Sequence, residues 1–258
     1  MKKNPKIGLA LGGGLARGLA HIGAIRVLQE KGIKIDYIAG TSMGSLIAAL
    51  YACGLKLKLI ERLAQRISRR TWMDLTFPRM GLIAGDKLEE LLYMLTGRRN
   101  FADLTLPLAV VAVDLISGER VVLTEGSVAR AVRASCAIPG IFSPVEIGGK
   151  LLVDGGVLQR VPASVVREMG AELVIAVDVG IHVGDYKISH IFDVMSKSLD
   201  IMSREIHRRQ SNDADVLIAP GVSDLGPFDF QCVEKAIDRG EEAAREVLPQ
   251  LVKLKKEG

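Results

Sequence analysis

The residues whose types and spacing most clearly suggest catalysis form the pentapeptide Gly40-Thr41-Ser42-Met43-Gly44. The apolar segment before it, residues 34–39, predicts a short buried strand, and residues 45–53 predict a helix. A serine between a strand and a helix sits in a strained turn that pushes its hydroxyl out of the sheet edge. The pattern therefore predicts that Ser42 is a nucleophile.

The residues on either side of this serine suit the same role. Gly40 and Gly44 let the backbones of strand and helix pass close together, where any Cβ would collide. The helix that begins at Met43 points free N–H groups toward the hydroxyl, where they stabilise developing negative charge. An ordinary strand-to-helix turn with an N-cap serine is the alternative interpretation.

A second strand-to-helix loop, Gly12-Gly13-Gly14-Leu15-Ala16-Arg17-Gly18, follows a predicted strand near the start of the chain. Such a loop suits dinucleotide binding, but the fingerprint G-x-G-x-x-G fails because Arg17 occupies the last glycine position. It also suits an oxyanion hole, because glycines expose backbone N–H groups without side-chain obstruction. A tight glycine turn is the structural alternative. Arg17 is either a substrate contact or a residue that ties the loop down, and we favour the latter.

The two loops are expected to lie side by side. If their strands are parallel neighbours joined by the intervening helix, the carboxyl ends of both strands meet at one sheet edge. Gly12 to Gly14 then face Ser42 at the edge where open α/β sheets bind ligands.

An acidic candidate comes later, in Asp154-Gly155-Gly156. Asp154 closes the apolar strand predicted at residues 150–153, and the two glycines after it leave room for a substrate and a nucleophile. This position suits a general base. In isolation, an aspartate before two glycines is more often a turn former.

Taken together, these motifs resemble those of the patatin-like phospholipase family, and the bacterial single-domain members most closely. The resemblance spans about residues 7–179. It implies an α/β fold with a central, mostly parallel sheet flanked by helices in three layers, in a single domain covering residues 1–258. The anchors are Gly12-Gly13-Gly14 with Arg17-Gly18, Gly40-Thr41-Ser42-Met43-Gly44, Ala134-Ser135 with Pro139, and Asp154-Gly155-Gly156.

The resemblance also implies the chemistry, which is hydrolysis of lipid acyl esters by a Ser–Asp dyad without a cofactor or metal. Ser42 corresponds to the nucleophile and Asp154 to the base. The oxyanion donors would be Gly12, Gly13 and Gly14, together with the Met43 N–H. The chain departs from the family pattern at Gln159-Arg160-Val161-Pro162, where many members have an Asn near a Pro, so the packing of this connection is open.

A Ser–His–Asp triad is the rival within the same chemistry. In the order serine, acid, histidine, only His182, His190 and His207 follow Asp154. His21 lies near the glycine loop, where a packed or hydrogen-bonded histidine is expected rather than a catalytic one.

Composition narrows the class of protein. The chain of 258 residues is 48% hydrophobic and 25% charged, which is typical of a soluble globular protein. A net charge of +4 favours contact with an anionic lipid surface, and neither a dense basic run nor abundant aromatic residues indicates nucleic-acid binding. An odd number of dispersed cysteines indicates reduced thiols in the cytoplasm. Residues 1–16 make a poor signal peptide, and residues 37–55 make a poor membrane span because of their Gly and Ser content.

Two further stretches bear on lipid contact. Residues 71–83 form an apolar loop that contains Trp72 and Phe77, and this loop is either a lid or membrane patch or a cover over the core. Residues 189–209 predict a helix. Its inward residues are expected to be Ile191, Val194, Met195, Leu199, Met202 and Ile206, with Asp200, Arg204, Glu205, Arg208 and Arg209 in solvent.

The predicted function is therefore a serine lipid acyl hydrolase of the phospholipase, lysophospholipase or carboxylesterase type. We expect a cytoplasmic protein with peripheral contact at the inner membrane face. A lipid-sensing module of the same fold, with slow or vestigial hydrolysis, is the alternative. Nucleotide binding at the glycine loop is a third hypothesis. The sequence does not specify the head group, the chain length, the balance of transfer over hydrolysis, or the oligomeric state.

Overall fold

The structure of the protein, a computed structural model, describes residues 5–66, 69–74, 80–180, 188–189, 191–209 and 213–257. A central sheet organises this part of the chain, with the strand order β10-β9-β1-β2-β4-β8-β7 and with β5 paired to β4. The parallel strands are β1 (Ile7–Leu11), β2 (Tyr37–Thr41), β4 (Leu108–Asp114), β9 (Leu173–Val177) and β10 (Val216–Ile218). The antiparallel strands are β5 (Arg120–Leu123), β7 (Val145–Ile147) and β8 (Lys150–Asp154).

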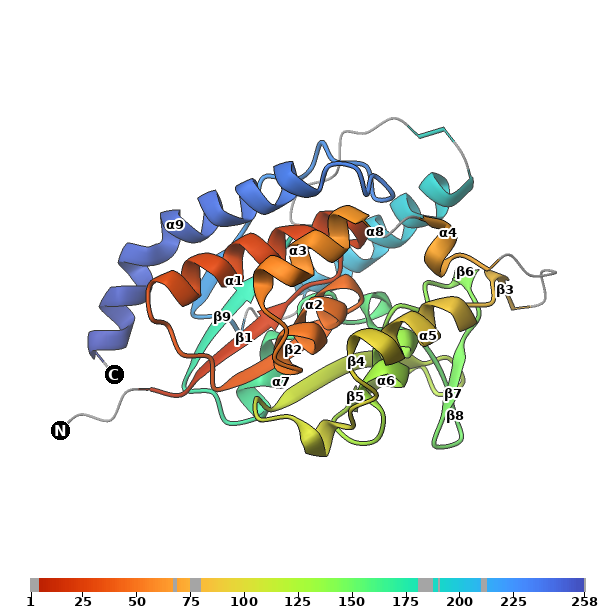
Figure 1. Ribbon diagram of the computed structural model, residues 1–258, viewed down its shortest axis with the longest axis horizontal. Helices are drawn as coiled ribbons and strands as arrows, with labels where there is room; N and C mark the ends of the chain where they lie inside the picture. The colour runs from red at the N-terminus through yellow and green to blue at the C-terminus, as the bar shows by residue number, and fades with distance from the viewer. Residues whose placement is uncertain are drawn as a thin grey trace.

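Helices cover both faces of this sheet (Figure 1). The central parallel strands are apolar and buried throughout, as expected of strands covered on both faces. On one face lies a large apolar core with α1 (Ala20–Glu30), α2 (Met43–Ala52), α3 (Leu57–Arg66), α5 (Asp86–Leu95), α6 (Val128–Ser135) and α9 (Val233–Glu257). On the other face, α7 (Ala163–Glu168) packs on small side chains that include Ala10, Ala39 and Val174. The predicted three-layer α/β fold, with a mostly parallel sheet, is confirmed.

Shorter elements complete the described part of the chain. They are η1 (Leu15–Leu19), η2 (Phe101–Asp103), η3 (Gly155–Val157) and α4 (Arg69–Trp72). A separate pair of strands, β3 (Gly81–Ile83) and β6 (Gly140–Phe142), lies beside α4. No helix of the described residues is long and apolar enough to span a membrane.

The structure describes the stretch 71–83 only in part. Trp72 is half-buried and stacks on Phe142 with 6.1 Å between the ring centroids, and it meets Phe230 edge-on at 5.8 Å. Trp72 therefore packs over the core, which agrees with the second of the two interpretations of this loop. Residues 75–79, which include Phe77, lie outside the described residues.

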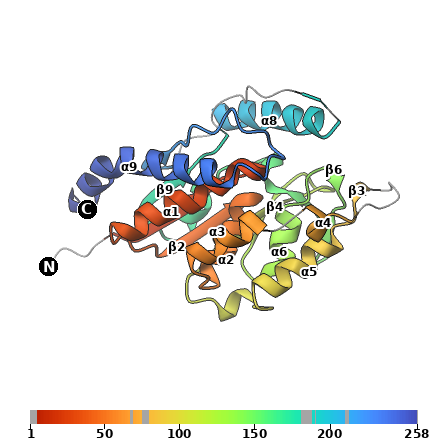
Figure 2. The same cartoon turned by 45° about the horizontal axis from the view of Figure 1, so that its top comes forward.

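Helix α8 (Ile191–Arg209) lies across the carboxyl end of the sheet, apart from the other helices (Figure 2). The sequence pattern predicted which side chains of this helix face the protein interior, and for three of them the prediction is wrong. Ile191, Val194 and Met202 are exposed by 63, 52 and 55%, whereas Ser196 and Ser203 are buried. Met195 and Leu199, which were predicted to face inward, are partly buried against the apolar core. The other three face solvent because the inner side of α8 is shared with the polar sheet edge that carries Ser42, over which Ser196 and Ser203 lie.

Candidate active site

Ser42 occupies the turn between β2 and α2 in a strained conformation, with φ 52° and ψ −125°. A positive φ is unfavourable for a residue with a side chain, so the surrounding packing must impose it. Close backbone contacts on both sides do so. A Cβ at Gly40 would lie 2.4 Å from the Gly44 carbonyl oxygen, and one at Gly44 would lie 2.1 Å from the Leu11 oxygen. The predicted strand–turn–helix with two obligatory glycines is confirmed.

The main chain of Ser42 is fixed from the end of α6. Its N–H donates to Ser135 Oγ at 2.8 Å, and Ser135 Oγ donates to the Val111 carbonyl oxygen at 2.6 Å. Ser135 is fully buried. One hydroxyl therefore ties the turn to β4. The sequence marked Ser135 as part of a motif but gave no sign of this contact, which depends on how α6 packs.

The register of three strands brings Asp154 to Ser42. Thr41 on β2 pairs with Val111 on β4, and the next residue of β4, Ala112, pairs with Asp154 on β8. Because β8 runs antiparallel to β4, its last residue falls at the level of the β2–α2 turn. Asp154 therefore reaches Ser42 across β4, although their strands are not neighbours.

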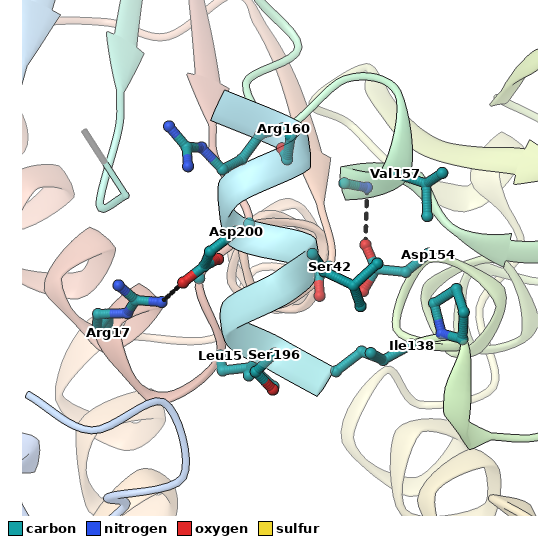
Figure 3. A pocket seen from close by; sticks show the side chains of 15 residues that line it. Leu15, Arg17, Ser42, Ile138, Asp154, Val157, Arg160, Ser196 and Asp200 are labelled. Carbon is teal, nitrogen blue, oxygen red and sulfur yellow. Dashed lines mark hydrogen bonds and ion pairs between the residues drawn. The ribbon is translucent and has the colours of Figure 1, made fainter. Parts of the chain in front are cut away.

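The carboxylate of Asp154 faces the hydroxyl of Ser42 in a buried setting (Figure 3). Burial raises the pKa of the Asp154 carboxyl to about 6, although hydrogen bonds from the Ser42 hydroxyl and from the Gly156 N–H lower it. The Gly156 N–H lies 2.8 Å from Oδ1 and orients the carboxylate. An aspartate of ordinary pKa is a weak base at neutral pH, so this shift suits proton abstraction from a serine.

The glycine loop lies against Ser42, as predicted, because β1 and β2 are parallel neighbours. A Cβ at Gly13 would be 3.3 Å from that of Ser42. Two of the predicted oxyanion donors are nevertheless engaged elsewhere. The Gly12 N–H donates to the Val177 oxygen at 2.9 Å, and the Gly13 N–H donates to the Arg160 oxygen at 3.0 Å. These bonds point both groups away from the site, which corrects the prediction and leaves the N–H groups of Gly14 and Met43 as candidate donors.

His21 holds the glycine loop through a hydrogen bond to its main chain. It is fully buried, and its Nε2 lies 2.7 Å from the Gly12 carbonyl oxygen. Burial lowers the pKa of His21 to about 4, so the ring is neutral and Nε2 carries the proton donated to Gly12. The expectation of a hydrogen-bonded, structural histidine is confirmed. Gly18 allows the same close packing, because a Cβ there would lie 2.4 Å from Met43 Cγ.

Arg17 links the loop to α8. Its side chain is almost fully buried, and Nη2 binds Asp200 Oδ2 at 2.6 Å (Figure 3). Arg17 therefore ties the loop to a helix, and it also lines the pocket that contains Ser42. Asp200 was predicted in solvent, and the sequence carries no local signal for a pair so far apart along the chain.

The connection that departs from the family pattern packs beneath the same loop. The Gln159 carbonyl oxygen accepts from Thr41 Oγ1 at 3.1 Å. The Arg160 side chain is buried and pairs with Asp178 at 3.3 Å. Gly155 allows η3 to approach β4, since a Cβ there would lie 2.4 Å from the Val111 oxygen. Residues 159–162 therefore connect the segment after Asp154 to the glycine loop, although their sequence departs from the family pattern.

Ser42 lines two adjoining pockets of different character. The first is open to solvent and also contains Asp154, the glycine loop, Arg17 and the underside of α8. The second is apolar. Its wall includes Met43, Leu46, Leu50, Trp72, Phe142 and Phe230. A polar pocket with an acid and a serine, beside an apolar one, can hold an ester that carries a long hydrocarbon chain.

Two neighbouring groups bear on the choice of nucleophile and base. The Cys136 thiol lies beside Ser42, and burial, followed by the charge of Asp154, raises its pKa to about 12, so it remains neutral. His182 and His190 lie outside the described residues, as does the side chain of His207.

Comparisons with known proteins agree with the fold and the motifs. The sequence model described as Patatin-like phospholipase matches residues 9–167. An uncharacterised NTE family protein of Mycobacterium tuberculosis is 38% identical over 177 residues, which is 67% of this chain and 49% of that protein. Lysophospholipase NTE1 of Debaryomyces hansenii is 33% identical over 183 residues, which is 69% of this chain and 12% of that protein. The chain thus spans half or less of the length of these relatives.

Among solved structures, VipD from Legionella pneumophila matches with a TM-score of 0.63 over 96% of this chain and 67% of that one. The two chains share 14% of their residues, so this likeness shows the fold alone. The family match covers the stretch from the first strand through the glycine loop, Ser42, Ser135 and Asp154. The chain belongs to the patatin-like phospholipase family.

Proposed function

We propose that the protein is a serine hydrolase of lipid acyl esters, of the lysophospholipase, phospholipase or carboxylesterase type, with Ser42 as nucleophile and Asp154 as base. The observation that carries the proposal is a strained serine that faces a buried carboxylate of raised pKa at the mouth of an apolar pocket. The family and the name of the yeast relative point to the same substrate class.

The reaction follows from these positions. Asp154 takes the proton of Ser42 as Oγ attacks the acyl carbonyl carbon, and the N–H groups of Gly14 and Met43 stabilise the oxyanion. The oxyanion collapses to an acyl-serine, and protonated Asp154 returns the proton to the departing alcohol. Water, deprotonated by Asp154, then attacks the acyl-serine and releases the fatty acid. The apolar pocket holds the acyl chain throughout.

The dyad is favoured over a triad because Asp154 and Ser42 line one pocket, and because the Ser42 hydroxyl lowers the pKa of the Asp154 carboxyl, as a neighbouring donor does. We further propose that the described fold acts as one domain, in the cytoplasm and at the surface of the inner membrane leaflet, without a metal or cofactor. Within the described residues, no group of three or more His, Cys, Asp or Glu side chains is arranged to hold a metal ion.

The test is labelling with a fluorophosphonate probe, followed by turnover of p-nitrophenyl butyrate, lysophosphatidylcholine and phosphatidylcholine. Wild type should be labelled and active, while Ser42→Ala should lose both and Asp154→Asn should lose turnover. The variants His182→Ala, His190→Ala and His207→Ala should each retain turnover. Loss of turnover in one of these three would replace the dyad with a triad. Lipid binding without labelling or turnover would favour the lipid-sensing module.

A further inference from the structure

Helix α8 turns a row of polar residues toward the active site and a stripe of apolar residues toward solvent, while Phe192, Met195 and Leu199 pack against the apolar core. The residues turned inward are Asp193, Ser196, Asp200 and Ser203, which recur at helical spacing along one face. The outer residues Ile191, Val194, Ile201 and Met202 are each more than half exposed. A surface helix of a soluble protein normally has the opposite arrangement.

Not every polar group on the inner side of α8 has a hydrogen-bond partner among the described residues. Ser196 Oγ and Ser203 Oγ are buried and have no hydrogen-bond partner within the described part of the chain. Both hydroxyls line the pocket that contains Ser42. The ion pair of Asp200 with Arg17 fastens the helix at its middle. Helix α8 is thus held over the site by one ion pair and by three partly buried apolar residues, Phe192, Met195 and Leu199.

The outer apolar side extends to a residue just before the helix, because Ile188 is also half exposed. We call this surface the α8 face. It is made of Ile188, Ile191, Val194, Ile201 and Met202.

The charged residues of α8 favour one of two partners for this face, an anionic lipid surface over a second copy of the chain. The sequence of α8 contains the basic residues Lys197, Arg204, Arg208 and Arg209. Of its acids, Asp193 accepts from the Ser189 N–H, Asp200 binds Arg17, and Glu205 is exposed. An apolar stripe on a helix with an excess of basic residues fits the boundary of an anionic lipid layer. A second copy of the same face would bring two such excesses of positive charge together.

The position of α8 connects this face to the proposed chemistry. Its underside, with Ser196, Asp200 and Ser203, lines the same pocket as Ser42 and Asp154 (Figure 3). Provided that the substrate is a lipid ester, as proposed above, we infer that the α8 face docks on an anionic phospholipid surface and that docking draws α8 away from Ser42. The lipid surface supplies the apolar environment that the outer side of the helix lacks in water.

The test compares three proteins on vesicles of phosphatidylcholine and phosphatidylglycerol in equal parts. One is wild type, one is Ile191→Gln/Val194→Gln/Ile201→Gln, and the matched control is Leu59→Gln/Met94→Gln/Val252→Gln, which removes three exposed apolar side chains from α3, α5 and α9. The α8 variant should bind vesicles at least about tenfold more weakly than wild type, and the control should bind as wild type does.

A second measurement reports the movement of the helix. Vesicles should speed fluorophosphonate labelling of Ser42 in wild type and in the control, but not in the α8 variant. Turnover of soluble p-nitrophenyl butyrate without vesicles should be equal in all three, which shows that each is folded and tests the proposed chemistry separately. If that turnover is absent from wild type, the proposed function fails, whatever the vesicles show.

Other outcomes overturn the docking proposal. Vesicle binding that survives in the α8 variant, or that falls equally in the control, would place the contact elsewhere. Binding without faster labelling of wild type would remove the link between docking and access. Self-association of wild type that the α8 variant abolishes, with vesicle binding unchanged, would assign the face to a second copy of the chain.

Discussion

The main-chain N–H of Ser42 donates a 2.8 Å hydrogen bond to the hydroxyl of Ser135, which donates in turn to β4. This bond fixes a turn whose φ of 52° is unfavourable for serine. Ser135 is therefore expected to act on the position of the nucleophile and not on the substrate.

Replacing Ser135 tests this relationship. Ser135→Ala leaves the Ser42 N–H without its acceptor, so we expect kcat for p-nitrophenyl butyrate to fall by about 10- to 100-fold with little change in KM. The free energy of unfolding should fall by about 1–3 kcal/mol. Thr96→Val is the control, because it removes a buried hydroxyl that donates to Leu92, away from the site. A kcat loss of equal size in Thr96→Val would mean that general destabilisation causes both effects.

The raised pKa of Asp154 predicts the pH dependence of the reaction. A base must be ionised, so kcat/KM for a soluble ester should fall tenfold per pH unit below about 6, with a single inflection near that value. An aspartate of ordinary pKa would move the inflection to about 4. The measurement is kcat/KM for p-nitrophenyl butyrate from about pH 3 to pH 9, over the range in which the enzyme stays folded. An inflection near 4 would contradict the desolvated carboxylate.

The same pKa has a consequence for stability. Because the folded pKa of about 6 exceeds the unfolded one, the native state binds this proton more tightly, and ionised Asp154 destabilises the fold. The penalty appears as the pH rises from about 4 to 6 and is fully present above that window.

The variant Asp154→Asn removes this penalty. It should therefore be more stable than wild type at pH 8, by up to about 3 kcal/mol, and similar to wild type at pH 4. Urea unfolding at both pH values measures the difference. Asp178→Asn, which deprives the buried Arg160 of its partner, should be less stable than wild type at pH 8. Equal stability of Asp154→Asn and wild type at pH 8 would refute the prediction.

His21 is predicted to hold the glycine loop through its bond to the Gly12 carbonyl oxygen. His21→Gln retains a donor and should keep kcat within about threefold of wild type, whereas His21→Leu loses the bond and should lose about tenfold or more. Because the pKa of His21 is lowered to about 4, neither variant should alter the pH profile above pH 5. A shifted inflection in His21→Gln would instead place His21 in the proton transfer.

The apolar pocket is predicted to set the length of the acyl chain. Leu46 lines it one helical turn after Ser42. Leu46→Trp should fill the pocket near the nucleophile, so kcat/KM for long-chain p-nitrophenyl esters should fall by about tenfold or more while the butyrate is spared. Leu46→Met, of similar volume, is the control. Equal loss for short and long chains would place the acyl chain elsewhere.

The sequence by itself determined the local parts of this site. The strand–turn–helix around Ser42 follows from an apolar strand, two glycines and a helical segment, and all of these signals lie within about twenty residues of one another. Asp154 at the end of a strand, and the glycine loop after another, are visible in the same way. Periodicity and apolar runs were also enough for the layered α/β fold.

Only the tertiary structure decided how these parts meet. The antiparallel direction of β8 places Asp154 level with Ser42, and the backbone bonds of Gly12 and Gly13 turn two expected donors away. The orientation of α8 was predicted only in part, because periodicity identifies an apolar face but not its surroundings. Met195 and Leu199 pack on the apolar core, whereas Ile191, Val194 and Met202 face solvent, since the polar edge with Arg17 and Ser42 lies beneath the rest of the helix.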